Sequence, residues 1–389
     1  MENEVGRGAS VDRTTRCRVC GGDFFTEPLL RYENMPRAAQ FLPGLDSLAS
    51  DRGVDLEICQ CSACGLVQLS SAPVSYYKDV IRAAAVSGEM KEFRRQQFAA
   101  FAGRYSLEGK KVIEIGCGRG EYLSIMQQSG MDAYGLEHSQ ESVSLCERDG
   151  LKAAAGFIPG DASSLSGAPF EAFFMLNFLE HLPDPKSTLL GIGSVLTRDS
   201  VGLVEVPNFD MILRKNLFSE LTSDHLSYFT RDTLSGALRL SGFDVVECDE
   251  IWHEYIISAV VRKRSKSDLS GFVRQQAALE AQLDRYIRRF GERRVAVWGA
   301  GHQALALICL LKLGNRIRYV VDSAPFKQGK YTAASHVPIV SPEALRSDPV
   351  DAVIVMAASY SDEVTAILRR EFDRRLNVCI LRDCGLEVV

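Results

Sequence analysis

Short apolar runs alternate with helical patterns from Lys110 onward. Segments 121–130 and 231–243 place apolar residues three or four positions apart and end near a glycine, as amphipathic helices do. Strands that alternate with such helices favour a parallel sheet covered on both faces. The strands predicted for this sheet are KVIEIG (111–116), DAYGLE (132–137), AFFMLNFL (172–179), VGLVEVP (201–207), DVVECDE (244–250) and EYIISAVVRK (254–263).

A second strand–turn–helix unit begins at residue 294, after a charged helical stretch over 264–293 that we interpret as a connecting helix. The first hundred residues have little periodicity and are expected to be irregular. The chain is therefore predicted to be an α/β protein of three domains, over residues 1–82, 83–264 and 265–389. Further strands of the last domain are predicted at RIRYVVD (316–322), DAVIVMAAS (351–359) and LNVCILRD (376–383).

The composition is that of an ordinary globular protein: 389 residues, 46% apolar, 24% charged, with a formal charge of −5. No apolar run is long enough to cross a bilayer, and residues 1–16 contain no apolar signal core. The negative charge gives no global basic surface for nucleic acid. We therefore expect a cytoplasmic protein without a membrane or nucleic-acid partner. In the cytoplasm, clustered cysteines are better explained as metal ligands than as disulfides.

Two C-x2-C pairs lie in the irregular N-terminal segment, Cys17 with Cys20 and Cys61 with Cys64. Four thiolates at this spacing suit tetrahedral Zn²⁺, and a site filled by four protein ligands is structural. Cys59 is the alternative partner of Cys61, but the C-x-C spacing is sterically tighter. A DNA-binding zinc ribbon is the alternative interpretation, although acidic residues in the segment leave no net basic surface.

A glycine-rich loop, VIEIGCGRGEYL, connects the first strand of the central region to a helix and reads E-x-G-x-G-x-G. An acidic residue ends the next strand about twenty positions later, where a carboxylate accepts from ribose hydroxyls. The glycine spacing differs from the dinucleotide pattern and resembles the first motif of class I S-adenosylmethionine (SAM) methyltransferases. FEAFFMLNFLEHLPDP looks like the fourth strand of that family. The cofactor-binding residues expected on this resemblance are Glu114, Gly116, Gly118, Gly120, Glu137 and Asn177.

The order of cysteine pairs, SAM-type region and second α/β region resembles the sugar-nucleotide (NDP-hexose) 3-C-methyltransferase family over nearly the whole chain. That resemblance implies an N-terminal zinc domain, a central class I SAM methyltransferase domain and a C-terminal Rossmann-like domain. It implies methyl transfer to carbon of a nucleotide-activated keto-deoxysugar. The matching pieces are MPRAAQFL (35–42), CSACGLVQL (61–69), Tyr76–Tyr77, the SAM loop, EHLPDP (180–185), DHLSYFT (224–230) and VDSAPFKQGKY…HVPIVSPEAL (321–345).

Methylation of carbon needs a base that removes the proton next to a ketone, and groups that stabilise the enolate oxygen. The resemblance points to His225 as the base, with Asp224 orienting it or stabilising its charged form. His181 is expected to polarise the keto oxygen or to hold a hydroxyl, and Tyr76 or Tyr77 to donate to the developing oxyanion. These five residues are the catalytic candidates.

The chain also departs from the family pattern Tyr-x-Glu-His, because it reads Thr222-Ser223-Asp224-His225. The aspartate is one methylene shorter, which leaves the sugar and the acceptor atom open. An O- or N-methyltransferase acting on another small molecule is therefore the alternative enzyme, and a zinc-ribbon binding module is the non-enzymatic one. Glu180, which precedes His181, is expected to be structural or to lie near the SAM.

The last domain opens with VAVWGAGHQALAL, a glycine turn between a strand and a helix that can cradle a phosphate. Asp322 ends the next strand, so an NAD site has to be considered. Against it, Ala304 replaces the third glycine, and the SAM site already provides a cofactor. The resemblance implies that this domain binds the sugar nucleotide instead. The substrate-binding residues expected here are Gly299, Gly301, Lys327 and Lys330.

Overall fold

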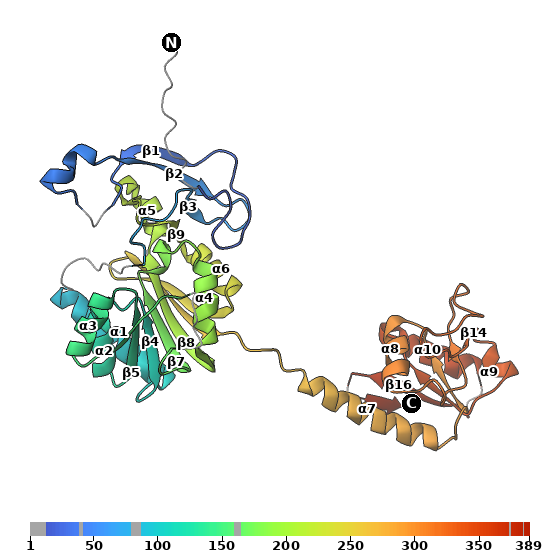
Figure 1. Ribbon diagram of the computed structural model, residues 1–389. Helices are drawn as coiled ribbons and strands as arrows, with labels where there is room; N and C mark the ends of the chain where they lie inside the picture. Colours follow the sequence, from blue (N-terminus) through green and yellow to red (C-terminus); the bar gives the residue numbers. More distant parts are fainter. Residues whose placement is uncertain (1–12, 39–41, 79–86, 159–164, 373–374, 384) are drawn as a thin grey trace, which may run out of the picture. The chain divides into compact units, whose positions relative to one another are not determined.

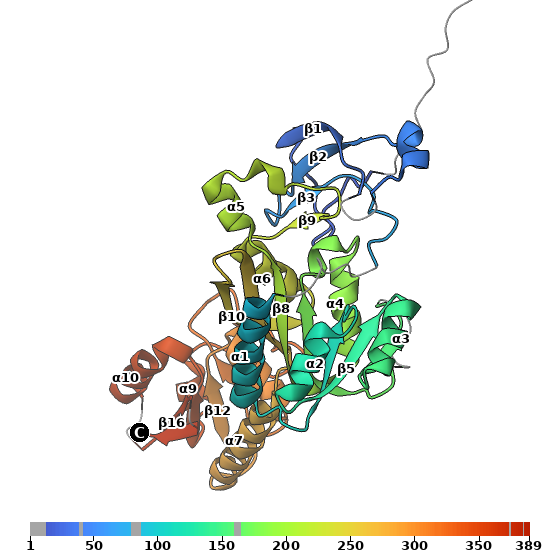
Figure 2. The ribbon, with the colours of Figure 1, turned by 90° about the vertical axis from the view of Figure 1, so that its left-hand side faces the viewer.

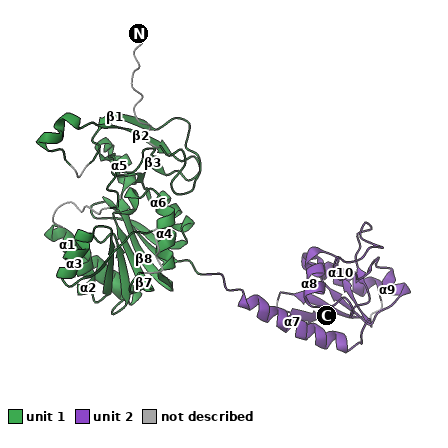
Figure 3. Ribbon diagram, viewed as in Figure 1, with its two compact units in different colours: residues 1–265 green, residues 266–389 purple. Residues whose placement is uncertain are grey.

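The computed structural model describes residues 13–38, 42–78, 87–158, 165–372, 375–383 and 385–389. It contains two compact units, Met1–Ser265 and Lys266–Val389, coloured separately in Figure 3. A division of the first unit at residue 82 stays a prediction, because residues 79–86 lie outside the described residues. Residues 39–41 of the MPRAAQFL segment lie outside them as well. No described helix is long and apolar enough to cross a membrane.

A seven-stranded sheet forms the centre of the first unit (Figures 1 and 2). Its order is β10-β11-β8-β7-β4-β5-β6, and β11 alone of these strands runs against the others. The expected parallel sheet is therefore confirmed except for this strand, which a tight turn joins to β10. The strands are β4 (Lys111–Ile115), β5 (Asp132–Glu137), β6 (Lys152–Ala155), β7 (Phe170–Leu176), β8 (Leu196–Pro207), β10 (Phe243–Ile251) and β11 (Ile256–Lys263).

Helices cover both faces of this sheet, as Figure 2 shows. On β7, Phe173 packs into one core and Phe174 into the other, because neighbouring strand residues point to opposite faces. Residues of α1 and α2 line the core of Phe174, and residues of α4 and α6 line the core of Phe173. The helices are α1 (Gly88–Tyr105), α2 (Glu121–Gln128), α3 (Gln140–Arg148), α4 (Pro185–Ser194) and α6 (Arg231–Leu240).

Helix α1 lies mostly in the part of the chain expected to be irregular, so this expectation was wrong. Its buried positions Arg94, Phe98 and Phe101 follow helical spacing, but an arginine at the first of them hides the pattern. The Arg94 guanidinium lies 2.5 Å from Oε2 of Glu205 on β8, and both side chains are almost fully buried. Pairing makes the burial of the two charges tolerable, so this contact joins α1 to the sheet.

The cysteine-containing segment also folds into more structure than expected, a four-stranded antiparallel sheet of order β1-β2-β3-β9. Its last strand, β9, comes from far along the chain, between α5 and α6 of the central region. This pairing of distant segments joins the N-terminal sheet to the rest of the first unit. The strands are β1 (Leu30–Met35), β2 (Val54–Gln60), β3 (Val67–Leu69) and β9 (Ser227–Tyr228), with a 3-10 helix at Leu45–Ser50.

The second unit is a Rossmann-like sheet of order β14-β13-β12-β15-β16-β17, with only β17 antiparallel. Helix α7 (Ser270–Arg288) belongs to its core, since Leu283 and Ile287 are buried there, so it is more than a connector. The remaining elements are β12 (Val295–Trp298), α8 (His302–Leu310), β13 (Val320–Val321), β14 (Ile339–Val340), α9 (Ala344–Ser347), β15 (Ala352–Val355), α10 (Ser361–Glu371), β16 (Asn377–Arg382) and β17 (Gly385–Val388).

Candidate active site

The glycine-rich loop leaves the end of β4 and turns into α2. Gly116, Gly118 and Gly120 have φ angles of 72°, 56° and 85°, which favour glycine because it has no Cβ. At Gly120 a Cβ would also lie 2.4 Å from Cδ1 of Leu151. The predicted glycine positions therefore have a local reason: the loop must turn through left-handed geometry while packing closely against its neighbours.

Glu137 ends β5 beside this loop and is almost fully buried. Its Oε2 accepts a 2.9 Å hydrogen bond from the Gly118 amide, and its Oε1 accepts one of 3.0 Å from the Ser139 amide. The carboxylate therefore shapes the glycine loop, and it lies at the strand end where the ribose is expected. Glu114, on the neighbouring strand β4, is fully buried.

Next to the loop lies a small hollow with an aromatic wall. The Tyr77 ring meets the Phe157 ring edge-on at 6.0 Å, and Nζ of Lys78 lies 5.1 Å from the Phe157 ring centre. An apolar, aromatic surface beside a glycine loop suits a purine base. Phe157 and Lys78 were not predicted, since neither stands in a recognisable motif. The hollow is lined by Lys78, Ile115, Gly116, Leu136, His138, Gly156, Phe157, Ile158 and Phe178.

Strand β7 ends at Leu176, three residues earlier than predicted. Asn177 follows with φ of 51° and an exposed side chain, which breaks the extended backbone. A 3-10 turn over Leu179–His181 then carries Glu180 into the interior and leaves His181 partly exposed. The end of β7 thus presents an amide and an imidazole at the carboxyl edge of the sheet, where ligands of open α/β sheets bind.

His181 lies beside the second predicted histidine. The rings of His181 and His225 are 4.8 Å apart and nearly perpendicular. Nδ1 of His181 lies 2.9 Å from the backbone oxygen of Asp224, and its Nε2 lies 3.8 Å from Oε1 of Glu180. One carboxylate oxygen of Glu180 and one nitrogen of each ring lie within 4.8 Å of one another. We call Glu180, His181 and His225 the histidine cluster.

Backbone pairing brings the two histidines together. The amide of Leu226 donates to the carbonyl of Glu180 at 2.8 Å, and its own carbonyl accepts from the amide of Leu69 at 3.0 Å. Leu226 thus lies between the turn after β7 and strand β3, directly after His225 and before β9. The position of His225 depends on this long-range pairing, which no local sequence pattern reveals.

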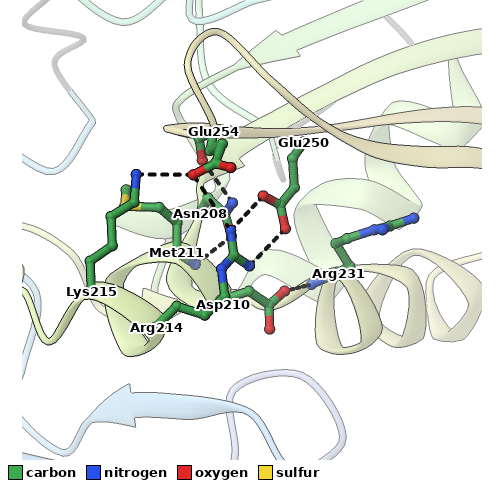
Figure 4. A network of polar contacts seen from close by, with 8 residues as sticks. All are labelled: Asn208, Asp210, Met211, Arg214, Lys215, Arg231, Glu250 and Glu254. Atoms are coloured by element: carbon green, nitrogen blue, oxygen red, sulfur yellow. Dashed lines mark hydrogen bonds and ion pairs between the residues drawn. The ribbon is translucent and has the colours of Figure 1, made fainter.

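Both ends of the segment that carries this histidine are anchored by the polar network of Figure 4. On α5 (Phe209–Lys215), Arg214 binds both carboxylate oxygens of Glu250 on β10, at 3.0 and 2.8 Å. At the start of α6, the amide of Arg231 donates to Asp210 at 2.8 Å. Two-point guanidinium–carboxylate pairs fix orientation as well as distance. Figure 4 also shows Asn208, Met211, Lys215 and Glu254.

The two adjacent tyrosines go to different parts of the site. Tyr76 donates a 2.7 Å hydrogen bond to Oδ1 of Asp224, whereas Tyr77 lines the aromatic wall of the hollow. The Tyr228 hydroxyl accepts from the amide of Thr222 at 2.9 Å and donates to its carbonyl at 3.0 Å, which holds the loop before the aspartate. The tyrosine pair therefore connects the hollow to the histidine cluster.

Burial controls the protonation of the histidine cluster. Desolvation, helped by the neighbouring His181, lowers the pKa of His225 to about 3, so its imidazole is neutral at neutral pH. Desolvation raises the pKa of Glu180. Its Oε2 is buried without a hydrogen-bond partner among the described residues. A neutral imidazole can accept a proton, which is the first requirement for a base.

The four cysteines of the two C-x2-C pairs meet in one cluster. The sulfurs of Cys17 and Cys64 are 3.6 Å apart, and those of Cys20 and Cys61 are 3.4 Å apart. A zinc–sulfur distance of about 2.3 Å in a tetrahedron places sulfurs about 3.8 Å apart, so the cluster fits Zn²⁺. Amides donate to two of the sulfurs, and the Gln68 amide donates to the Cys17 sulfur at 3.3 Å.

In the second unit, the glycine turn is explained by packing as well as by ligand access. A Cβ at Gly299 would lie 2.5 Å from the carbonyl oxygen of Met356. Asp322 accepts from the Ala300 amide at 2.8 Å and from Nζ of Lys327 at 2.9 Å. These bonds hold the pKa of Asp322 low although burial opposes its ionisation. The Asp322 carboxylate thus holds the glycine turn, as Glu137 holds the glycine loop of the first unit, and it also pairs with a lysine. Two of the predicted substrate-binding residues are exposed to solvent. They are Gly301, which precedes α8, and Lys330, which lines a shallow pocket with Tyr331 and Ser341.

Comparisons with known proteins agree with this architecture. Residues 88–248 match the methyltransferase domain model, and residues 264–378 match the C-methyltransferase C-terminal domain model. The chain is 24% identical over 381 residues to the C-methyltransferase NovU of Streptomyces niveus, with 90% of each protein covered. It is 32% identical over 89 residues to a ubiquinone biosynthesis O-methyltransferase of Methylococcus capsulatus, covering 22% of this chain and 38% of that protein. A SAM-dependent methyltransferase structure from Archaeoglobus fulgidus matches 44% of this chain and 97% of its own, with 20% identity and a TM-score of 0.34.

The protein is an enzyme, a SAM-dependent methyltransferase. Both domain models match in the order expected, and the similarity to the C-methyltransferase NovU runs through nearly the whole chain, which supports a C-methyltransferase. This result excludes the non-enzymatic binding module considered from the sequence.

Proposed function

We propose that the enzyme methylates a carbon atom of a nucleotide-activated keto-deoxysugar after removing the proton next to the ketone. The observation that carries this proposal is the pair of imidazoles, His181 and His225, 4.8 Å apart beside the Tyr76–Asp224 hydrogen bond. A base and several hydrogen-bond donors at one edge of the sheet are what formation of an enolate requires. Methyl transfer to oxygen or nitrogen needs no enolate, since those atoms already carry a lone pair.

In this proposal His225 is the base and His181 contacts the keto oxygen. His225 is neutral and partly buried, so it can take a proton at neutral pH. Tyr76 is the proposed donor to the developing oxyanion, and its hydroxyl proton, which Asp224 accepts in this structure, would turn to the oxyanion when substrate is bound. Asp224 keeps the loop in place. Tyr77 acts on the other side, where its ring helps to shape the hollow.

The SAM is proposed to lie along the glycine loop. The residues that would hold it are Gly116, Gly118 and Gly120, which have no side chain to block a ligand's approach to the loop, together with the carboxylate of Glu137 and the exposed side chain of Asn177. Glu114 would support the loop from β4. When bound, SAM supplies an electrophilic methyl group on a sulfonium. The protein's task is to orient the carbon acceptor toward that methyl and to exclude water.

The nucleotide part of the substrate is proposed to bind the second unit. Gly301 precedes α8, whose first amides suit a phosphate, and Lys330 is exposed in the same unit. Gly299 supports the turn, and Lys327 acts through its ion pair with Asp322. Positive charge and free amides would recognise a diphosphate.

We also propose that Cys17, Cys20, Cys61 and Cys64 hold a structural Zn²⁺. The short sulfur–sulfur distances and the amides directed at the sulfurs support this ligand set. Four protein ligands leave no open position on the metal, so the ion would stabilise the N-terminal sheet rather than take part in the reaction.

The test is proton exchange in the absence of SAM. The purified enzyme is incubated in D2O with a thymidine-diphospho-4-keto-6-deoxysugar, and the C3 proton is followed by NMR. Loss of that signal supports proton removal from a keto-sugar nucleotide. Binding of SAM without exchange on a panel of such sugars would instead favour methyl transfer to oxygen or nitrogen of another small molecule.

A further inference from the structure

The histidine cluster contains Glu180, a residue without a role in the reaction proposed above. Glu180 is 2% exposed, yet one of its carboxylate oxygens has no hydrogen-bond partner among the described residues. A buried carboxyl that lacks a partner loses free energy relative to water, and such groups need an explanation. Its other oxygen lies 3.8 Å from Nε2 of His181, so the side chain is directed at the histidines.

The tautomer of His181 follows from its other ring nitrogen. Nδ1 lies 2.9 Å from the backbone oxygen of Asp224, and a carbonyl oxygen only accepts hydrogen bonds. Nδ1 therefore carries the proton, and Nε2 of the neutral ring has a free lone pair toward Glu180. A proton on Nε2 would complete a carboxylate–imidazolium pair without any change in the backbone.

The proposed base needs such a partner. Burial disfavours a positive charge on His225, so an isolated imidazole at this position would be a weak acceptor for a proton from carbon. The other ionisable groups near it are His181, which repels a second positive charge, Tyr228, 6.3 Å from its ring, and Asp224. Oδ1 of Asp224 accepts from Tyr76 at 2.7 Å.

We propose that Glu180 is a positioning residue of the reaction, whose carboxylate, together with His181, stabilises the imidazolium that forms on His225. This inference rests on the proposed carbon methylation. The C–H bond next to the ketone breaks, its proton passes to the free ring nitrogen of His225, and its electron pair forms the enolate. The electron pair then forms the bond to the SAM methyl group with loss of the thioether, and the proton leaves His225 for solvent. With Glu180 ionised, the cluster carries one negative charge before the step and none after it.

The pH dependence follows from the charge of Glu180. Burial raises the pKa of its carboxyl, so the carboxyl becomes protonated on lowering the pH earlier than an ordinary glutamate does. Protonation removes the charge that supports the imidazolium. The rate of proton removal should therefore be high above this raised pKa and fall as the pH decreases through it.

The test compares wild type with Glu180→Gln and Glu180→Asp. Glu171→Gln is the matched control, since Glu171 also has a buried carboxylate oxygen without a partner among the described residues, but it lies at the opposite end of β7. With ¹³C-labelled glutamate and ¹⁵N-labelled histidine, NMR should show the ¹⁵N signals of both imidazoles following the titration of the Glu180 carboxyl. His181→Asn and His225→Asn assign the signals. The imidazole step should vanish in Glu180→Gln and persist in Glu171→Gln.

The rate of C3 proton exchange should fall about 10–100-fold in Glu180→Gln, lose its acid limb, and recover in part in Glu180→Asp, with SAM affinity unchanged. Imidazole signals that do not follow the carboxyl, or that titrate identically in Glu180→Gln, would overturn the proposal. So would a second metal ion per chain lost in Glu180→Gln, because the cluster would then be a metal site. If Glu180→Gln does not fold, Glu180→Asp and the wild-type NMR titration still decide. Coupled titration without exchange in wild type would leave the role of Glu180 in the cluster intact and count against carbon methylation.

Discussion

The hydroxyl of Tyr76 donates a 2.7 Å hydrogen bond to Oδ1 of Asp224, which joins two residues far apart in the chain. Asp224 holds His181 through its backbone oxygen and immediately precedes His225. One residue thus connects a tyrosine of the N-terminal segment with both imidazoles. The proposed catalytic groups form a single contiguous unit rather than separate features of the surface.

Replacement of the proposed base should abolish proton removal without affecting the cofactor. We expect His225→Asn to reduce C3 proton exchange and turnover by about 10²–10⁴-fold, the range typical of a lost general base. SAM affinity, measured by calorimetry, should be unchanged. His336→Asn is the control, since His336 is exposed in the second unit and asparagine tolerates its left-handed φ of 51°. Near-normal exchange in His225→Asn would remove this residue from the role.

Substitutions of the adjacent tyrosines, Tyr76 and Tyr77, should change different kinetic constants. Tyr76→Phe removes the bond to a carboxylate, so we expect kcat to fall about 10–100-fold with little change in KM for SAM. Tyr77→Ala should instead raise KM for SAM, because its ring packs against Phe157 in the hollow. Steady-state kinetics with varied SAM distinguish the two. Equal effects of both changes on the same constant would contradict the division of roles.

The proposed contact between Glu137 and the ribose of SAM can be tested while the hydrogen bond to the glycine loop is kept. Glu137→Gln keeps an oxygen that can accept from the Gly118 amide but removes the charge. We expect SAM affinity to fall about 10–100-fold, as for loss of a hydrogen bond to a charged group. The melting temperature should also fall somewhat, because the new NH2 group faces the Ser139 amide, which donates to Oε1 in the wild type. Glu147→Gln on the exposed side of α3 serves as the control. An unaltered dissociation constant would place the ribose elsewhere.

The proposed metal ligands can be tested by comparing two neighbouring cysteines, Cys59 and Cys61. Cys61→Ser should release about one zinc ion per chain and lower the melting temperature, since metal binding contributes to folding of such a segment. Cys59→Ser should retain the metal, because Cys59 is buried in β2 outside the four-cysteine cluster. Elemental analysis of both purified variants provides the measurement. Zinc retained in Cys61→Ser and lost in Cys59→Ser would reverse the assignment.

Features that depend on neighbours along the chain could be predicted from the amino-acid sequence. The strands Lys111–Ile115 and Asp132–Glu137, the glycine loop between them and the C-x2-C pairs were all predicted, because residue periodicity and glycine positions express local backbone requirements. The family resemblance added the catalytic candidates His181 and His225. The pattern of apolar residues did not predict helix α1, because the buried Arg94 interrupts the spacing that would reveal a helix.

Which groups meet in the candidate active site depends on how distant segments of the chain pack together. His225 lies beside His181 because Leu226 bonds both to Glu180 and to Leu69, so strands from opposite ends of the first unit pair around it. Glu180 was expected to be structural or close to the SAM, and it became a candidate only when its unpaired oxygen was found among the imidazoles. Burial and long-range pairing set these properties, and both depend on residues far apart in the sequence.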